Sequence, residues 1–418
     1  MRTPILRACL ALTALAGIRP APARGQDLVL LHARVVDVER GTVLPEGVVV
    51  VRGGSIAQVG GTVPAGADLP TVDVGGMYLS PGLMDAHVHI ATFDQARRAL
   101  ESGVTTVRSM GVDDYADVGL RELAAAGAID APEVLAAGYH IRPHPSEAFF
   151  RNHPEMGRFV STEVRGAETL AAMARTMLGR GVDFIKLNAT ERAGLPDTDP
   201  RKQFYDASEM GAVVAEVRRA GARGVAAHAH GDEGARAAVE AGVTSIEHGT
   251  YMSPETLRLM AERGTYLVPT VAIVRDLTIP GGDYESPVLM LRGRHMLPRV
   301  QEMVATAHEL GVPIVAATDT GYGPAGVVRV SHELEELVGI GLTPLEALQA
   351  ATVTAARLLG VDDHTGQVRV GLDGDLILTE RNPLEQIGTL NDVLMVVNNG
   401  KIVFTKGDWF KGSGPISD

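Results

Sequence analysis

Over its middle part the chain alternates short apolar runs, rich in valine, isoleucine and threonine, with longer amphipathic stretches. Short runs of this composition predict strands, whereas apolar positions spaced three and four apart predict helices. We expect about eight strands, at residues 78–89, 104–109, 134–139, 184–188, 225–230, 245–248, 265–270 and 314–319. Helices are expected after most of them, for example at residues 208–220, 232–241 and 294–310.

A glycine recurs between the end of a helical stretch and the start of the next apolar run. It occurs at Gly103, Gly181, Gly242, Gly264 and Gly311. Glycine just past a helix can take the left-handed conformation that ends it, after which the chain enters a strand. Eight alternating strand and helix units favour an α/β fold, a (β/α)8 TIM-like barrel. The alternative is a doubly wound open sheet, but its phosphate-binding glycine pattern does not follow the early strands.

The two ends of the chain have a different pattern. Residues 27–76 and 365–405 contain alternating β-type runs, such as the four valines from Val48 to Val51 and the run around Leu376. Neither piece is long enough to form a stable sheet on its own. We therefore expect residues 26–78 and 365–418 to pack into one small composite β-sandwich domain, with the barrel inserted as residues 79–364.

The N-terminus has the composition of an export signal. Two arginines flank an early apolar stretch, residues 8–18, and small residues follow it, so residues 1–25 are expected to be a signal peptide. The protein would then be periplasmic or secreted, and the alternative is a disordered cytosolic leader. No later segment approaches the ~20 apolar residues that span a bilayer.

Composition limits the chemistry. The single cysteine, Cys9, lies in the expected signal peptide, so any metal site must use nitrogen and oxygen ligands. The 418 residues carry a formal net charge of −13, which makes nucleic acid an improbable partner and leaves a small molecule as the expected one. With 45% hydrophobic residues the chain can bury a large core.

Histidines and one aspartate cluster at the ends of the predicted strands. His87 and His89 are two residues apart, so they project to the same face of a strand and can chelate one ion. His228, His248 and Asp319 end three further strands. The carboxyl ends of barrel strands converge on one mouth, and imidazole and carboxylate are the ligands that zinc accepts in hydrolytic sites.

Several motifs together resemble the amidohydrolase superfamily, in its branch of binuclear-metal peptidases and amidases such as Xaa-Pro dipeptidases and N-acyl amino acid hydrolases. They are PGLMDAHVH at 81–89, FIK at 184–186, AHAHG at 227–231, IEHGT at 246–250 and TDTG at 318–321. The resemblance extends from about residue 27 to residue 405. It implies a distorted barrel with metal ligands at the ends of strands 1, 4, 5, 6 and 8, and a composite β domain.

The resemblance also implies a ligand set and a modification. Two divalent ions, zinc in this interpretation, would be held by His87, His89, Lys186, His228, His248 and Asp319. Lys186 would be carbamylated, since an ammonium group offers no lone pair to a metal. The alternative is an ordinary lysine paired with Asp319 or Glu247, with one metal ion. His228 is chosen over His230 because it lies twenty residues before His248.

Further residues are expected to act in proton transfer, in support of the ligands or in substrate binding. Asp319 is expected to move the proton during amide cleavage, or to act as a ligand alone. Asp85 is expected to support the orientation of a histidine. His230 would face the substrate, or be a packed structural residue. The resemblance further places His140 and Tyr251 against the substrate, and Arg142 or Arg151 could clamp a carboxylate unless both are solvated.

The expected function is hydrolysis of an amide bond in a dipeptide or an N-acyl amino acid, including bulky aromatic amides, by a hydroxide held between two metal ions. The alternative within the superfamily is a cyclic-amide hydrolase or deaminase of the imidazolonepropionase type, which tends to be mononuclear. A third reading is a non-catalytic metal- or sugar-binding protein on a barrel scaffold. Both a monomer and a homo-oligomer are compatible with the sequence.

Overall fold

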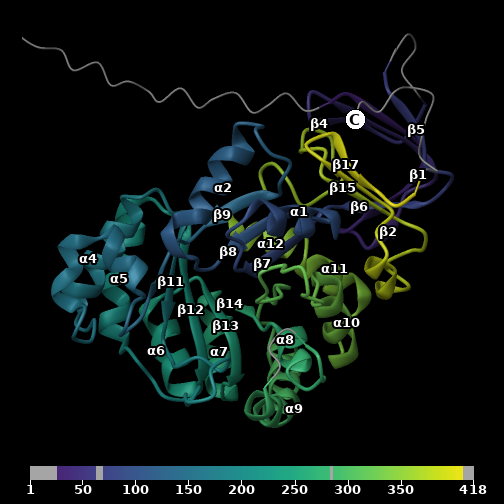
Figure 1. The fold of residues 1–418 in the computed structure, drawn as a ribbon. Helices are drawn as coiled ribbons and strands as arrows, with labels where there is room; N and C mark the ends of the chain where they lie inside the picture. Colours follow the sequence, from purple (N-terminus) through teal and green to yellow (C-terminus); the bar gives the residue numbers. More distant parts are fainter. Residues whose placement is uncertain (1–25, 63–68, 283–285, 408–418) are drawn as a thin grey trace, which may run out of the picture.

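The computed structural model describes residues 26–62, 69–282 and 286–407 (Figure 1). The expected signal peptide, residues 1–25, lies outside the described residues. Within them, no helix is both long and apolar enough to cross a membrane. The described chain forms two parts, a parallel barrel and a smaller sheet that lies beside it (Figure 1).

Parallel strands form the barrel as the sequence predicts. In chain order they are β7 (Leu83–Val88), β8 (Val104–Ser109), β9 (Glu133–Ala136), β10 (His140–Ile141), β11 (Phe184–Asn188), β12 (Gly224–Gly231), β13 (Ser245–Tyr251) and β14 (Tyr266–Val268). β9 pairs with β8 and β10 pairs with β11, so these two short strands together make the third stave. The β-bridges Leu267–Ile314 and Val88–Thr320 join the last stave to β14 and to β7, which closes the barrel.

The last stave, expected at residues 314–319, is less regular than the others because side chains replace some of its backbone partners. The backbone N–H of Thr318 donates to the Asp85 carboxylate at 3.0 Å instead of to a neighbouring strand. Asp319 takes a left-handed φ of 55°, which ends the extended conformation. The first predicted strand, 78–89, is divided at Gly82, where a Cβ atom would lie 2.1 Å from Oγ1 of Thr105.

Helices surround the barrel (Figure 1). They are α1 (Phe93–Glu101), α2 (Ala116–Ala125), α3 (Glu147–Asn152), α4 (Ala167–Leu178), α5 (Ala207–Ala220), α6 (Asp232–Ala241), α7 (Pro254–Arg263), α8 (Val271–Asp276), α9 (Pro287–Glu309), α10 (Val330–Ile340), α11 (Pro344–Ala350) and α12 (Val353–Leu359). The glycines expected to end helices all have positive φ, for example 87° at Gly242 and 68° at Gly264. Helix α9 begins earlier than expected, with Pro287 in its first turn.

Two hydrophobic layers hold the barrel together. Inside, Met84, Phe184, Ala226, Val268 and Val315 from different staves form one buried cluster. A second and larger cluster lies between the strands and the surrounding helices. With its interior filled by side chains, the barrel is a packed core, and only the carboxyl ends of its strands are free to form a site.

Strands from both ends of the chain form the smaller sheet. It contains β1 (Leu28–Asp37), β2 (Thr42–Val43), β3 (Gly47–Arg52), β4 (Ser55–Val59), β5 (Thr71–Asp73), β6 (Tyr78–Pro81), β15 (Leu376–Thr379), β16 (Met395–Asn398) and β17 (Lys401–Thr405). Its order is β17-β16-β15-β6-β1-β3-β4, with β2 and β5 on β1. Leu30 and Val49 share one buried cluster with Leu376 and Val397, so the two halves enclose a common core.

Candidate metal centre and active site

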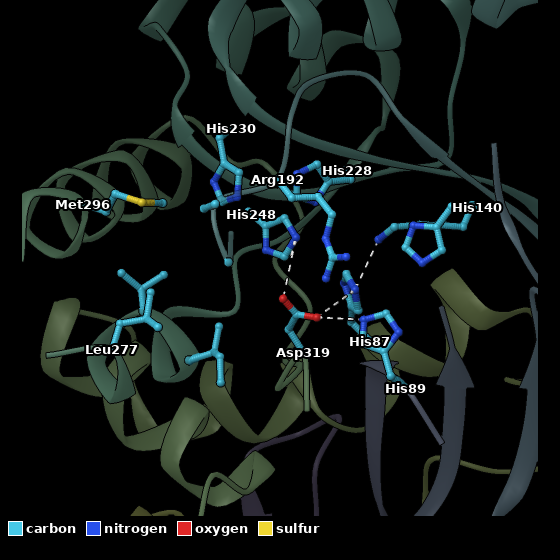
Figure 2. A pocket seen from close by; sticks show the side chains of 15 residues that line it. His87, His89, His140, Arg192, His228, His230, His248, Leu277, Met296 and Asp319 are labelled. Carbon is cyan, nitrogen blue, oxygen red and sulfur yellow. Dashed lines mark hydrogen bonds and ion pairs between the residues drawn. The ribbon is translucent and has the colours of Figure 1, made fainter. Parts of the chain in front are cut away.

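A cavity opens at the carboxyl ends of the barrel strands. It is open to solvent, and its empty volume, counted together with the solvent space at its mouth, is about 630 Å³. Figure 2 shows imidazole rings and the Asp319 carboxylate gathered at its centre. Of the expected site residues, the cavity is lined by His87, His89, His140, Lys186, His228, His230, His248 and Asp319.

The first group of potential ligands comes from β7 and the last stave. His87, His89 and Asp319 offer atoms that all lie within 4.8 Å of one another. Oδ1 of Asp319 lies 3.0 Å from Nε2 of His89 and 3.4 Å from Nε2 of His87. Burial raises the pKa of Asp319, but the adjacent imidazoles of His87 and His89 outweigh it and hold the pKa well below its ordinary value. The carboxylate is therefore ionised and surrounded by nitrogen donors.

The second group comes from β12 and β13. His228, His230 and His248 also offer atoms within 4.8 Å of one another. The rings of His230 and His248 are stacked, with centroids 4.7 Å apart, and the His228 centroid lies 4.7 Å from that of His248. The sequence separated His228 as a ligand from His230 as a substrate residue, whereas the structure brings all three together. Asp319 links the groups, since its Oδ2 lies 3.9 Å from Nε2 of His248.

Lys186 is buried among these residues. Its Nζ lies 3.2 Å from Nε2 of His87, and among the described residues no ion pair joins it to Asp319 or Glu247. Burial lowers the pKa of Lys186 to about 8, so a substantial fraction of the amine is neutral near physiological pH. A neutral amine is the form that reacts with carbon dioxide. The geometry therefore gives no support to the ordinary ion-paired lysine considered above.

Three of the rings are held by a hydrogen bond on Nδ1. Nδ1 of His89 donates to the carbonyl of Gly111 at 2.8 Å, and Nδ1 of His248 lies 2.8 Å from Oγ1 of Thr270. Nδ1 of His230 has the same relation to Oγ1 of Thr250, at 2.9 Å. These contacts leave Nε2 of the three rings free, which is the arrangement found where histidine binds a metal. His228 is held by its other nitrogen, because its Nε2 lies 3.1 Å from the carbonyl of Glu191.

The protonation state of the rings also suits a metal. Burial lowers the pKa of His87 to about 4 and that of His230 to about 3. Burial also holds the pKa of His228 and of His248 well below the ordinary value. Neutral imidazole is the ligand form of histidine, so the donor set fits divalent ions such as zinc.

Strained backbone occurs at the site. His248 has a φ of 75°, Asp319 of 55° and Thr270, the partner of His248, of 51°. Residues other than glycine rarely take this conformation, and it persists where the surrounding structure enforces it. In a regular strand Glu247 and His248 would point to opposite sides. The left-handed turn at His248 breaks that alternation, so both side chains contact the site.

A buried ion pair beneath the site was not predicted from the sequence. Oε2 of Glu247 lies 2.8 Å from Nδ1 of His87, and Oε1 accepts a hydrogen bond from Arg108 at 2.9 Å. Burial raises the pKa of Glu247, but Arg108 and His87 outweigh it and bring the pKa down to about 2. A charged residue inside the otherwise uncharged run 104–109 was the signal that could have revealed Arg108.

Asp85 contacts His87 through the backbone of that histidine, and it binds mainly to residues of the last stave and the segment after it. Its carboxylate accepts hydrogen bonds from Oγ1 of Thr318 at 2.6 Å and from the Tyr322 hydroxyl at 2.9 Å. It reaches the backbone N–H of His87, at 3.3 Å, and not the ring. Asp85 thus ties the first stave to the last, while Glu247 orients the His87 ring.

The expected substrate residues divide into two sets. His140 lines the cavity, with Nδ1 3.0 Å from Oδ1 of Asn188 and its ring stacked on His89 at 5.9 Å. Tyr251, whose ring centroid lies 6.1 Å from that of His295, and Arg142 are not among the lining residues. Arg192, which the sequence did not suggest, does line the cavity.

We predict that Thr270→Val weakens metal binding about 10- to 100-fold, because it removes the hydrogen bond that orients His248. Thr250→Val is the matched change at His230. If His230 faces substrate and is no ligand, Thr250→Val will leave metal affinity unchanged. Competition with a chromophoric chelator measures both affinities. If both variants weaken metal binding equally, His230 is a metal ligand.

Comparison with known proteins places this site in a family. The amidohydrolase family model matches residues 78–403. The chain is 28% identical over 381 residues to ochratoxinase from Aspergillus niger, covering 80% of this chain and 76% of that protein. It is 24% identical over 406 residues to imidazolonepropionase from Shewanella frigidimarina, covering 86% and 93% of the two chains.

Solved structures agree. A Xaa-Pro dipeptidase with methionine bound in its active site superposes with a TM-score of 0.78 at 26% identity, covering 91% of this chain and 100% of that chain. A putative prolidase from Bifidobacterium longum gives 0.78 at 29% identity, covering 92% and 96%. This chain belongs to the amidohydrolase family and is a hydrolase acting on carbon–nitrogen bonds.

Proposed function

We propose that this protein cleaves the amide bond of a small N-acyl amino acid or dipeptide in a metal-dependent reaction. The observation that carries the proposal is the convergence of two groups of imidazoles on Asp319 and the buried Lys186, in one open cavity. The similarity to an ochratoxinase and to Xaa-Pro dipeptidases supports amide substrates. Residues 1–25 would direct export to the periplasm or the medium.

The residues present fit two divalent ions, which we take to be zinc. The proposed ligands are His87, His89, Lys186 as its carbamate, His228, His248 and Asp319. Bound ions would polarise the amide carbonyl and make water a nucleophile near neutral pH. The buried Glu247, held by Arg108, keeps the His87 ring in the orientation that this role needs.

Asp319 is the proposed proton carrier. Its carboxylate lies between the two histidine groups, with Oδ1 toward His89 and Oδ2 toward His248 (Figure 2). From that position it can accept a proton from the attacking water and return it to the leaving nitrogen, which amide cleavage requires. His140 and His230 line the same cavity and would hydrogen-bond the substrate.

Metal removal tests the proposal without knowledge of the natural substrate. We predict that the purified protein contains two zinc equivalents, that 1,10-phenanthroline abolishes amide hydrolysis, and that zinc restores it. Removal of the metal ions should also lower the melting temperature, because ions that bind only the folded chain stabilise it by mass action. Elemental analysis, calorimetry and a screen of dipeptides, Xaa-proline and N-acyl amino acids give the readouts. Full activity in metal-free protein would contradict the proposal.

Cyclic-amide hydrolysis is the second candidate, because imidazolonepropionases are among the relatives. Lys186, which lines the same cavity as both groups and lies 3.2 Å from Nε2 of His87, favours the binuclear alternative. A screen that includes cyclic amides separates the two by product and by metal stoichiometry, since a single equivalent with a cyclic substrate would support the second.

A further inference from the structure

An arginine without a partner projects into the cavity. Arg192 lies in the loop after β11, and Figure 2 shows its guanidinium reaching toward the same centre as His228 and Asp319. Among the described residues no hydrogen bond or ion pair to this guanidinium is found, whereas the neighbouring Glu191 carboxylate is paired with Lys202 at 2.8 Å. A fixed cation at a site wall, with its donors free, is suited to an anion supplied by the substrate.

The loop that carries Arg192 is held in place. Arg292, on α9, donates to the carbonyls of Ala193 and Thr198 at 2.6 Å each, and to that of Leu195 at 2.5 Å. On the other side of the loop, Nε2 of His228 donates to the carbonyl of Glu191 at 3.1 Å. Arg192 is therefore presented by a backbone anchored on both sides, so little order has to be gained when it binds a ligand.

Two arginines bring positive charge to this side of the cavity. Arg142 lies close by, and burial, with repulsion from Arg192, lowers the pKa of Arg142. The only acid among the lining residues is Asp319, which is engaged by His89 at 3.0 Å.

The opposite wall is apolar. Ile273, Val274, Leu277 and Met296, from α8, α9 and the segment between them, line it. Figure 2 shows Leu277 and Met296 across the cavity from Arg192, with Asp319 and the histidines between the two sides. This wall offers no acid to an ammonium group, and burying an unpaired charge there would be costly.

We propose that Arg192 binds the carboxylate of the substrate and that the preferred substrates are N-acyl amino acids with an apolar acyl group. The acyl group would lie against α8 and α9, the carboxylate at Arg192, and the scissile amide between them at Asp319. A dipeptide would place its free ammonium group on the apolar wall and is disfavoured. The inference rests on the proposed amide hydrolysis and specifies its substrate.

The test compares two probes that differ only in charge, N-benzoyl-L-phenylalanine and N-benzoyl-L-phenylalaninamide, with the dipeptide L-phenylalanyl-L-phenylalanine as a third. In the zinc-loaded protein we expect kcat/KM for the carboxylate probe to exceed that for the other two at least tenfold. Arg192→Gln should raise KM for the carboxylate probe about 10- to 100-fold, since a charge-assisted bidentate contact is lost, and change kcat little. For Arg192→Lys, the KM for the carboxylate probe should lie between those of the wild type and Arg192→Gln.

Arg236→Gln, an exposed change on α6, is the matched control and should alter neither constant. Binding of both N-benzoyl probes is also measured by calorimetry on the Asp319→Asn background, so that the outcome does not depend on turnover. Equal handling of the N-benzoyl probes, no binding of the carboxylate probe, or an unchanged ratio in Arg192→Gln would overturn the inference while leaving amide hydrolysis standing. Arg192-dependent binding without hydrolysis in the wild type would support the contact between Arg192 and the carboxylate, but it would reject the proposed function and with it the inferred substrate preference.

Discussion

Replacing Asp319 by asparagine is expected to lower kcat for amide hydrolysis on the order of a thousandfold. The amide is nearly the same size as the carboxylate, so it can keep the position between His89 and His248. It cannot accept a proton, however, and it is a weaker ligand. Steady-state kinetics with zinc-loaded protein measure the loss, and elemental analysis shows whether metal is retained.

The fold should survive this change. Asp319 carries a negative charge next to imidazoles that burial keeps neutral, so its removal leaves no buried cation unpaired. We expect the melting temperature of the zinc-loaded protein to shift by only a few degrees. Asp362→Asn, at an exposed residue, is the control and should behave as the wild type. Near-normal turnover in a metal-loaded Asp319→Asn protein would reject the proton role.

Hydrophobic periodicity predicted the barrel because most of its strands and helices lie where the pattern of apolar residues indicates them. The run 184–188 is β11 residue for residue, and helix α6 has the bounds expected from its apolar spacing. The last stave was predicted at the right place, but not its irregular pairing. That irregularity depends on Asp85 binding Thr318, which lies more than two hundred residues away in the chain.

The sequence predicted that the proposed ligand residues would lie together, because the carboxyl ends of barrel strands converge. His87 and His89 share a face by the two-residue period of a strand, and the structure brings both to Asp319. The His228–His230 pair obeys the same period, so periodicity alone could not separate a ligand from a substrate residue. The structure places both beside His248, so the distinction stays a prediction.

Residues that act through contacts distant in the sequence were not predictable. Glu247 faces the site together with His248 because His248 has a left-handed φ. No sequence pattern predicts that conformation at a histidine. Arg192 lies in a loop without hydrophobic periodicity. The position of this loop depends on hydrogen bonds that Arg292 of α9 donates to its backbone carbonyls. Arg142 was a reasonable expectation for a carboxylate clamp, and the structure places its neighbour Arg192 in the cavity instead.

Replacing Lys186 by methionine distinguishes a carbamate from an ordinary amine by the sign of its effect on metal binding. Methionine is apolar and of similar length, so it suits the buried position. If Lys186 is a carbamate, the change removes an anionic ligand, the metal content falls from two ions to one, and kcat falls on the order of a thousandfold. If Lys186 is an ammonium, the change relieves repulsion of a dication, and metal affinity rises.

We expect the first result. Direct evidence comes from nuclear magnetic resonance of zinc-loaded protein grown with ¹³C-bicarbonate, in which a carbamate gives a carbonyl signal that the methionine variant lacks. Lys202→Met, at an exposed lysine paired with Glu191, is the control and should leave the signal and the metal content unchanged. Because a carbamate supplies a carboxylate-like anion, formate added to the Lys186→Met protein should restore part of the lost activity. Two tightly bound ions in Lys186→Met, with normal turnover, would show that the lysine has no part in holding the metal.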